Sequence, residues 1–328
     1  MTSRLIFTLF FLLIISCNAA LAEVLPHSSE NALNWLKKMA EAPAQYNYSG
    51  IFVYYAEGHI EASRTIHKID KTGQHEKIEV LDGTPRIVFR NNDEMRCYLP
   101  ESKKAYSEKR WFRKFFPDLL PQPSNEIDNN YHVKETKRER IANHESQVLL
   151  LTPRDSLRYG QQFWVDMQTG LLLKVAVVEG DEIIEQFSFV QIEIDKEIQL
   201  NMLQPDHSLL TSDWQAIELV SSILNEGELK WQVKTLPKGF KKLVEMKRNL
   251  IDKSTLVDHI ALSDGLATVS IFIEPIVKNA PTPMPGFFTS RGAINIYVRI
   301  LGDNKITTVG EVPLKTIKLI GDSVYKQE

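Results

Sequence analysis

The sequence predicts an α+β protein in which a large, curved antiparallel sheet is followed by a smaller α+β domain. The first observation is that residues 161–195 contain three strand-like runs separated by turn signals at 166–170 and 179–181. Gly and Asp in these turns suit short hairpin loops. The second observation is that both faces of the runs are largely apolar, which is typical of strands covered on both sides. A half-open antiparallel β-barrel with a helical plug in its mouth accommodates such strands.

The composition is that of a soluble globular protein. The chain has 328 residues, of which 43% are hydrophobic and 25% are charged, and this length is enough for two domains. The formal net charge of −3 gives no overall attraction to nucleic acid. We therefore expect no nucleic-acid partner, and an anionic ligand would have to meet a local basic patch.

Residues 1–22 have the pattern of a signal peptide. Arg4 precedes an apolar run, Leu5–Ile15, that is too short to span a bilayer, and Ala20-Leu21-Ala22 matches a small-x-small cleavage pattern. Cleavage after Ala22 predicts an exported, soluble chain. The alternative is a bacterial lipoprotein signal in which Cys17 is acylated, but the cleavage pattern close behind it favours plain export.

Residues 23–200 are predicted to form the large barrel domain. Residues 29–42 fit a helix, because Ser28 or Ser29 can cap it, an apolar stripe follows, and Pro43 ends it. Short strands then follow at regular spacing over residues 46–99, and further strands over 133–140 and 147–151. A meander of this size has to curl.

A basic and aromatic segment separates the two groups of strands. It could contact an anionic amphiphile or a membrane surface, or its aromatic side chains could plug the sheet in a helical turn while the bases point outward. The two interpretations are compatible. The candidate ligand-binding residues are Lys109, Arg110, Trp111, Phe112, Arg113, Lys114, Phe115 and Phe116.

Residues 201–227 are predicted to be a linker, with one helix over 212–224, and residues 228–328 a small α+β domain. Two hairpins are expected in this domain, over 256–274 and 293–309, because Gly and Asp turns separate their apolar runs. Pro313 favours a helix start and begins a final helix with an apolar face from Leu314 to Val324.

No residue pattern in the chain indicates an enzyme, a metal site or a cofactor site. The sequence contains no nucleophile elbow, phosphate loop, dinucleotide fingerprint or His-Glu-x-x-His motif. His59, His67 and His75 are evenly spaced, but their spacing favours surface histidines on strands over metal ligands. Cys97 is the single cysteine after Ala22, and we expect it to be a small buried side chain on a strand. These features favour a binding protein.

Several short motifs, taken in order, resemble those of the MucB/RseB family. They are the signal peptide, Leu33–Met39, the Tyr-x-Gly-x-Phe strand at Tyr48–Phe52, Asp166–Gly170, Trp231 with Leu236-Pro237-x-Gly239-Phe240, Ser263-Asp264-Gly265 and Val309–Pro313. The resemblance covers nearly all of the mature chain. It implies periplasmic regulators of the sigma-E envelope-stress response, with a large domain similar to the lipoprotein carriers LolA and LolB.

The resemblance also implies a partner and a signal. The partner is the periplasmic domain of a membrane anti-sigma factor (RseA-like), which the protein shields from the site-1 protease until lipopolysaccharide or a lipoprotein acyl chain releases it. Phe287, Phe288 and Arg291 are the candidate contacts, because aromatic residues and Arg dominate binding hot spots. A periplasmic lipid or lipoprotein carrier stays open as the alternative, an exported hydrolase is more distant, and homo-oligomerisation is open.

Overall fold

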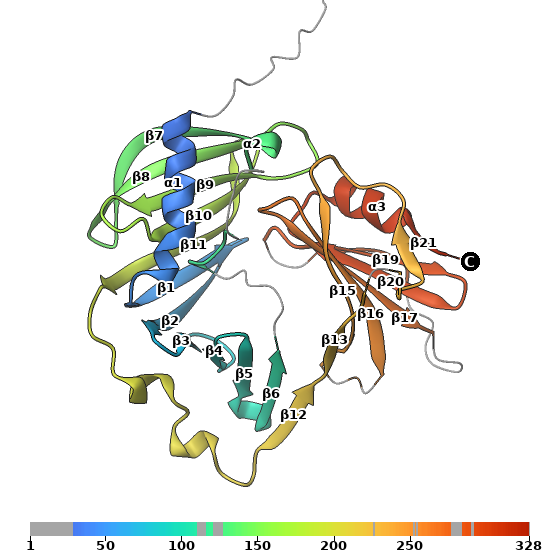
Figure 1. The fold of residues 1–328 in the computed structure, drawn as a ribbon, viewed down its shortest axis with the longest axis horizontal. Helices are drawn as coiled ribbons and strands as arrows, with labels where there is room; N and C mark the ends of the chain where they lie inside the picture. Colours follow the sequence, from blue (N-terminus) through green and yellow to red (C-terminus); the bar gives the residue numbers. More distant parts are fainter. Residues whose placement is uncertain are drawn as a thin grey trace, which may run out of the picture.

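A computed structural model shows two sheets joined side by side (Figure 1). It describes residues 29–109, 116–120, 127–225, 227–251, 253, 255–276, 284–289 and 292–327. The first twenty-eight residues, including the predicted signal peptide and Cys17, lie outside the described residues. We call the twelve-stranded sheet with its helix α1 the large unit, and the seven-stranded sheet with its helix α3 the small unit.

The large unit is an antiparallel meander in which the chain comes back on itself. Strand β11 pairs with β1, so that the N-terminal hairpins and the later hairpins share one sheet with the order β12-β6-β5-β4-β3-β2-β1-β11-β10-β9-β8-β7. The strands are β1 (Tyr48–Ala56), β2 (His59–Asp70), β3 (Gly73–Val80), β4 (Ile87–Asn91), β5 (Glu94–Leu99), β6 (Lys104–Lys109), β7 (Tyr131–Ile141), β8 (His144–Pro153), β9 (Gly160–Asp166), β10 (Leu172–Glu179), β11 (Glu182–Ile194) and β12 (Gln215–Leu219).

The sheet is open, which corrects the expectation of a barrel. Its two end strands, β12 and β7, are not paired with each other. Helix α1 lies across the half of the sheet formed by β7–β11 and β1 (Figure 1). Its side chains and the apolar side chains of these strands form one core, so this face is buried without closing the strands into a ring.

Helix α1 (Glu30–Glu41) forms as the sequence predicts. The Ser29 hydroxyl accepts a hydrogen bond from the Ala32 amide at 3.1 Å, which satisfies one of the free N–H groups at a helix start. Leu36 and Met39 are buried on its inner stripe, and the chain passes into a 3-10 turn, η1 (Ala42–Ala44), at Pro43. The helix therefore contributes its apolar face to the core of the large unit.

The segment between the units is fixed to both, and the predicted helix over 212–224 is wrong. Leu209 and Trp214 pack against Phe89 and Tyr98 on the large sheet. The chain then forms β12, which pairs in parallel with β6, and β13 (Ser221–Ile223), which pairs with the small sheet. Pairing at two sheet edges overrides a local preference for helix in this segment.

The small unit is a second antiparallel sheet with a helix on one face. Its strand order is β13-β15-β16-β17-β20-β19-β18, with β15 (Lys241–Asn249), β16 (Leu256–Ser263), β17 (Thr268–Pro275), β18 (Gly286–Thr289), β19 (Asn295–Leu301) and β20 (Asn304–Gly310). Helix α3 (Leu314–Asp322) packs on β19 and β20. A separate two-stranded pair joins β14 (Trp231–Val233) to β21 (Val324–Lys326).

Both predicted hairpins of the small unit are confirmed, and its last helix differs in detail. Ile317 and Ile320 are buried on α3 as expected, but Leu314 is exposed and Val324 belongs to β21. The chain leaves the helix at Ser323, whose hydroxyl donates to the Thr235 carbonyl at 2.9 Å. Val324, the last apolar residue of the predicted helix face, therefore enters the core from strand β21.

Candidate binding surfaces and the junction of the two units

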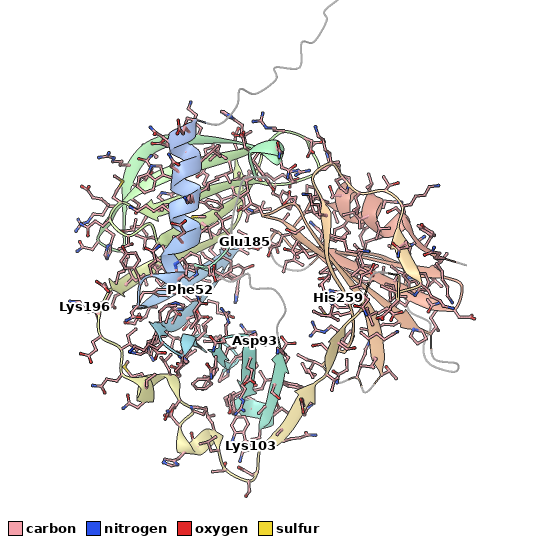
Figure 2. All side chains as sticks on the ribbon, viewed as in Figure 1. Phe52, Asp93, Lys103, Glu185, Lys196 and His259 are labelled. Atoms are coloured by element: carbon pink, nitrogen blue, oxygen red, sulfur yellow. The ribbon has the colours of Figure 1, made fainter. Side chains whose placement is uncertain are left out.

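The concave face of the large sheet has an apolar half, and Phe116 is packed into it. The Phe116 ring lies 5.4 Å from that of Phe52, 5.7 Å from Phe187 and 5.1 Å from Phe189, measured between ring centroids. Phe52 lies on the strand face behind α1 (Figure 2). Phe116 therefore packs into the apolar core on this face, as expected if its aromatic ring plugs the sheet.

Among the other residues of the basic and aromatic segment, the structure describes only Lys109. Lys109, at the end of β6, is exposed and forms an ion pair with Asp93 at 3.1 Å. The remaining six, Arg110, Trp111, Phe112, Arg113, Lys114 and Phe115, lie outside the described residues.

The half of the same face formed by β2–β4 is polar and also buried. Glu76 forms an ion pair with Arg90 at 3.0 Å, with both side chains less than a tenth exposed. His67 stacks on Tyr48 at 4.5 Å and its Nε2 lies 2.8 Å from the Pro43 carbonyl oxygen. His67 is therefore not the surface histidine that the sequence predicts. Burial, and next the Glu76 carboxylate, raise the pKa of Tyr48 well above its ordinary value.

The two units meet at a polar cluster that we call the polar joint, formed by Asn130, Tyr131, Asp155, Arg158 and Asp264, of which only Asp155 is exposed. The guanidinium of Arg158 donates to the Asp264 carboxylate at 2.8 Å, and both side chains are completely buried. Arg158 also donates to Asp155 at 3.1 Å and to the Lys238 carbonyl at 2.6 Å. A buried charge of this kind is tolerated only when its donors are satisfied.

Asp264 is held from both units. The Tyr131 hydroxyl donates to its carboxylate at 3.1 Å, and the Asn130 amide donates to its carbonyl oxygen at 3.0 Å. Its other carboxylate oxygen accepts from the backbone N–H groups of Leu266 and Ala267, which shapes the turn between β16 and β17. The joint therefore fixes a turn of the small unit against a loop of the large one.

Gly239 permits this close approach. Its φ of +87° is in the left-handed region, and a Cβ there would lie 1.9 Å from Oδ1 of Asn130. A side chain at this position would meet both backbone strain and the facing unit.

A second set of contacts ties the units together around Glu185 of β11 (Figure 2). Its carboxylate accepts from the Ala293 N–H at 2.9 Å and from the Tyr54 hydroxyl at 3.4 Å. Burial raises the pKa of Glu185 above its ordinary value. The Asn295 amide also donates to the Tyr159 hydroxyl at 3.0 Å. This hydrogen bond and the one from Ala293 cross from one unit to the other.

A cleft of about 590 Å³ opens beside these contacts, and we call it the junction cleft. The large unit supplies the β1–β2 turn and the β10–β11 hairpin, and the small unit supplies the start of β19 and the start of α3. The lining residues are Tyr55, Glu57, Tyr159, Glu179, Glu182, Ile183, Ile184, Gly292, Asn295, Pro313, Leu314 and Lys315.

The predicted partner contacts Phe287 and Phe288 lie on β18, the last strand of the small sheet. Their exposed fractions are 47% and 41%, and the Phe287 ring lies 5.0 Å from that of Tyr297. Within the described residues, β18 is paired only with β19. Arg291, the third predicted contact, lies outside the described residues.

Among the described residues, no group of three or more His, Cys, Asp or Glu side chains could hold a metal ion. Within the same ranges, no helix is long and apolar enough to cross a membrane. Cys97 is half-buried on β5 and is not part of a disulfide bond among the described residues. Sequence reasoning missed Arg158 and Glu185, and it treated Asp264 only as part of a turn motif.

These features define a two-sheet protein with a cleft at the junction of its units and an exposed strand edge on its small sheet. The chain belongs to the MucB/RseB family: the model of the MucB/RseB N-terminal domain matches residues 31–207, and that of the C-terminal domain matches residues 225–325.

Similar proteins and structures span nearly the whole chain. The sigma factor AlgU regulatory protein MucB of Pseudomonas aeruginosa is 28% identical over 309 residues, with 90% of each chain covered. The sigma-E factor regulatory protein RseB of Haemophilus influenzae is 23% identical over 316 residues, covering 94% of this chain and 96% of its own. The solved complex of Pseudomonas aeruginosa MucA and MucB matches with a TM-score of 0.69 and 25% identity, covering 91% of this chain and 99% of the solved one.

Proposed function

We propose that this protein is a periplasmic regulator of a sigma-E type of envelope-stress response. It binds the periplasmic domain of a membrane anti-sigma factor and shields that domain from proteolysis. The observation that carries the proposal is that both halves of the chain match the MucB/RseB family. A relative with the same two-sheet fold is solved in a complex with MucA.

We assign the main docking surface to the small unit, at the edge of β18. An edge strand presents unpaired backbone N–H and C=O groups, to which an extended peptide can add as a further strand. Phe287 and Phe288 are exposed there, and aromatic side chains of this kind anchor interfaces. Arg291 follows two residues after β18 and stays part of the proposal as a contact.

Binding and shielding are tested with substitutions at the strand edge of the full mature chain. Phe287→Ser with Phe288→Ser should weaken binding of the recombinant periplasmic anti-sigma domain at least tenfold in calorimetry, and should restore its cleavage by the site-1 protease. Tyr325→Ser is the matched control, because Tyr325 is an exposed aromatic residue of the same unit on β21, which pairs with β14 and not with β18. Unchanged binding and shielding by the double variant would overturn the assignment of β18.

The release signal in this proposal is a lipid or a lipoprotein acyl chain that enters the concave face of the large sheet. Support comes from the apolar half of that face and from Phe116 packed within it. Each buried methylene of an acyl chain contributes about 0.8 kcal/mol, so a few of them suffice for measurable affinity. The bases at 109–114 would meet the anionic head group, and that contact would weaken with salt.

Replacing Arg110, Arg113 and Lys114 together by Gln tests the ligand half of the proposal. Lipopolysaccharide binding should weaken, while binding of the anti-sigma domain stays near that of the parent. Equal binding of both partners by the triple variant would reduce the segment to a plug with solvated charges. Lipid binding by a parent chain that does not bind the anti-sigma domain would favour the periplasmic lipid or lipoprotein carrier instead.

A further inference from the structure

The junction cleft has exposed apolar walls. Tyr55, Ile183 and Leu314 are large hydrophobic residues, yet their exposed fractions are 38%, 45% and 42%. They come from three elements of two units and face one cleft. Apolar side chains that gather in one concave place, and are not scattered over the surface, indicate a site for another molecule.

The charge around these walls has one predominant sign. Glu57, Glu179 and Glu182 line the cleft on the large unit, and Lys315 is the single basic residue among the described residues of the lining. All three carboxylates are exposed, and the described residues show no ion pair to any of them. Three carboxylates and one ammonium group give these described lining residues a formal charge of −2, which favours a cationic occupant.

The walls are held in place before anything binds. Tyr159 and Asn295 are hydrogen-bonded to each other across the cleft, and Thr316 on α3 donates to the Leu157 carbonyl at 2.7 Å. Glu185 fixes the turn that leads into β19 through the Ala293 N–H. A surface that is already organised spends less free energy on ordering when it binds.

We propose that the junction cleft binds an extended polypeptide segment in which Lys or Arg residues stand next to apolar residues. The apolar side chains lie against Tyr55, Ile183 and Leu314, and the cations lie at the rim carboxylates. The inference rests on the proposed function in that the natural source of the segment is the anti-sigma periplasmic domain. The strand edge at β18 leads toward the cleft, because Thr289 of β18 is paired with Asn295 in the cleft lining.

Charge reversal in the full mature chain tests the site. Glu57→Lys, Glu179→Lys and Glu182→Lys together should weaken binding of the recombinant anti-sigma domain about tenfold at low salt, and by less at high salt, because rim charges are screened. The matched control is Glu193→Lys with Glu197→Lys, since both residues are exposed and neither lines the cleft. The control should stay within twofold of the parent. Parent-like affinity of the triple variant would overturn the cleft proposal while leaving binding at β18 intact.

A model peptide separates this proposal from the proposed function. A fluorescent peptide of alternating Leu and Lys should bind the parent chain, and its Leu and Glu counterpart should bind at least tenfold more weakly. The triple variant should lose this preference. If the parent chain binds the Leu and Lys peptide but not the anti-sigma domain, the regulator function is refuted and the proposed peptide site in the cleft still stands. Equal binding of the two peptides would refute the proposal that the cleft selects cationic peptides.

Discussion

The two ends of the junction between the units are built in opposite ways. At the polar joint, the ion pair of Arg158 and Asp264 is completely buried, and Arg158 is also held by Asp155 and by the Lys238 carbonyl. At the junction cleft, large apolar side chains and carboxylates face solvent. The difference suggests a division of labour, in which one end sets the orientation of the units and the other end offers the surface that this orientation creates.

The largest expected effect comes from breaking the polar joint. Asp264→Ala removes the buried carboxylate partner of Arg158 and leaves only the partly exposed Asp155, and removing one partner of a buried ion pair costs about 3–5 kcal/mol. Urea unfolding of the mature chain should show this loss. Asp155→Ala should cost much less, because its side chain is about a third exposed. Equal effects of the two substitutions would mean that burial of the pair is not what secures the joint.

A smaller loss of stability is expected from adding a side chain at Gly239. Gly239→Ala places a Cβ against Asn130 and strains a left-handed backbone, where a non-glycine residue costs about 1–2 kcal/mol before any clash. Gly180→Ala is the matched control, with φ of +61° and nothing within 4 Å of the added Cβ. The difference between their unfolding free energies isolates the contact between the units. Equal losses would show that the approach at Gly239 is not tight.

The small unit should lose stability in acid through His259. Burial lowers the pKa of His259 from 6.5 to about 3, so the folded chain keeps it neutral while the unfolded chain binds a proton below pH 6.5. Its contribution is fully present above pH 6.5 and is lost as the pH falls toward 3, by about 2 kcal/mol at pH 5. His259→Phe should flatten this dependence in denaturant titrations at pH 7 and pH 5. An unchanged slope would show that other groups cause it.

Glu185 should produce the smallest effect, with the opposite dependence on pH. Because burial raises its pKa in the folded chain above 4.5, its ionisation weakens folding as the pH rises through the folded pKa. Glu185→Gln keeps an oxygen that can accept from the Ala293 N–H and removes the charge. The variant should therefore be slightly more stable at pH 7, and this gain should vanish below about pH 4.5. A loss of stability at pH 7 would show that the charge itself holds Ala293.

Much of the fold could be predicted because local patterns specify it. Helix α1 has a cap, an apolar stripe and a proline stop, and the hairpins of 256–274 and 293–309 have Gly and Asp turns. Strands β6 and β15 were not predicted, because Lys and Glu interrupt their apolar pattern. Which sheet edge a strand joins is decided by its neighbours, as it is for β12 beside β6.

The candidate site could be predicted only in part. The exposed aromatic pair Phe287 and Phe288 is visible in the sequence, since it follows a proline-rich loop. Arg158 and Asp264 are 106 residues apart, and neither lies in a pattern that indicates a partner. A pairing of this kind results from how two sheets dock, and a single sequence carries no local signal of it.

Hydrogen exchange of the mature chain, with and without the anti-sigma periplasmic domain, tests the division of labour most directly. Amides at the polar joint, such as those of Leu266 and Ala267, should already exchange slowly and change little, because their hydrogen bonds are buried. Amides of β18, the β10–β11 hairpin and the start of α3 should become protected by the partner. Protection confined to other surfaces, or none at all, would contradict the account.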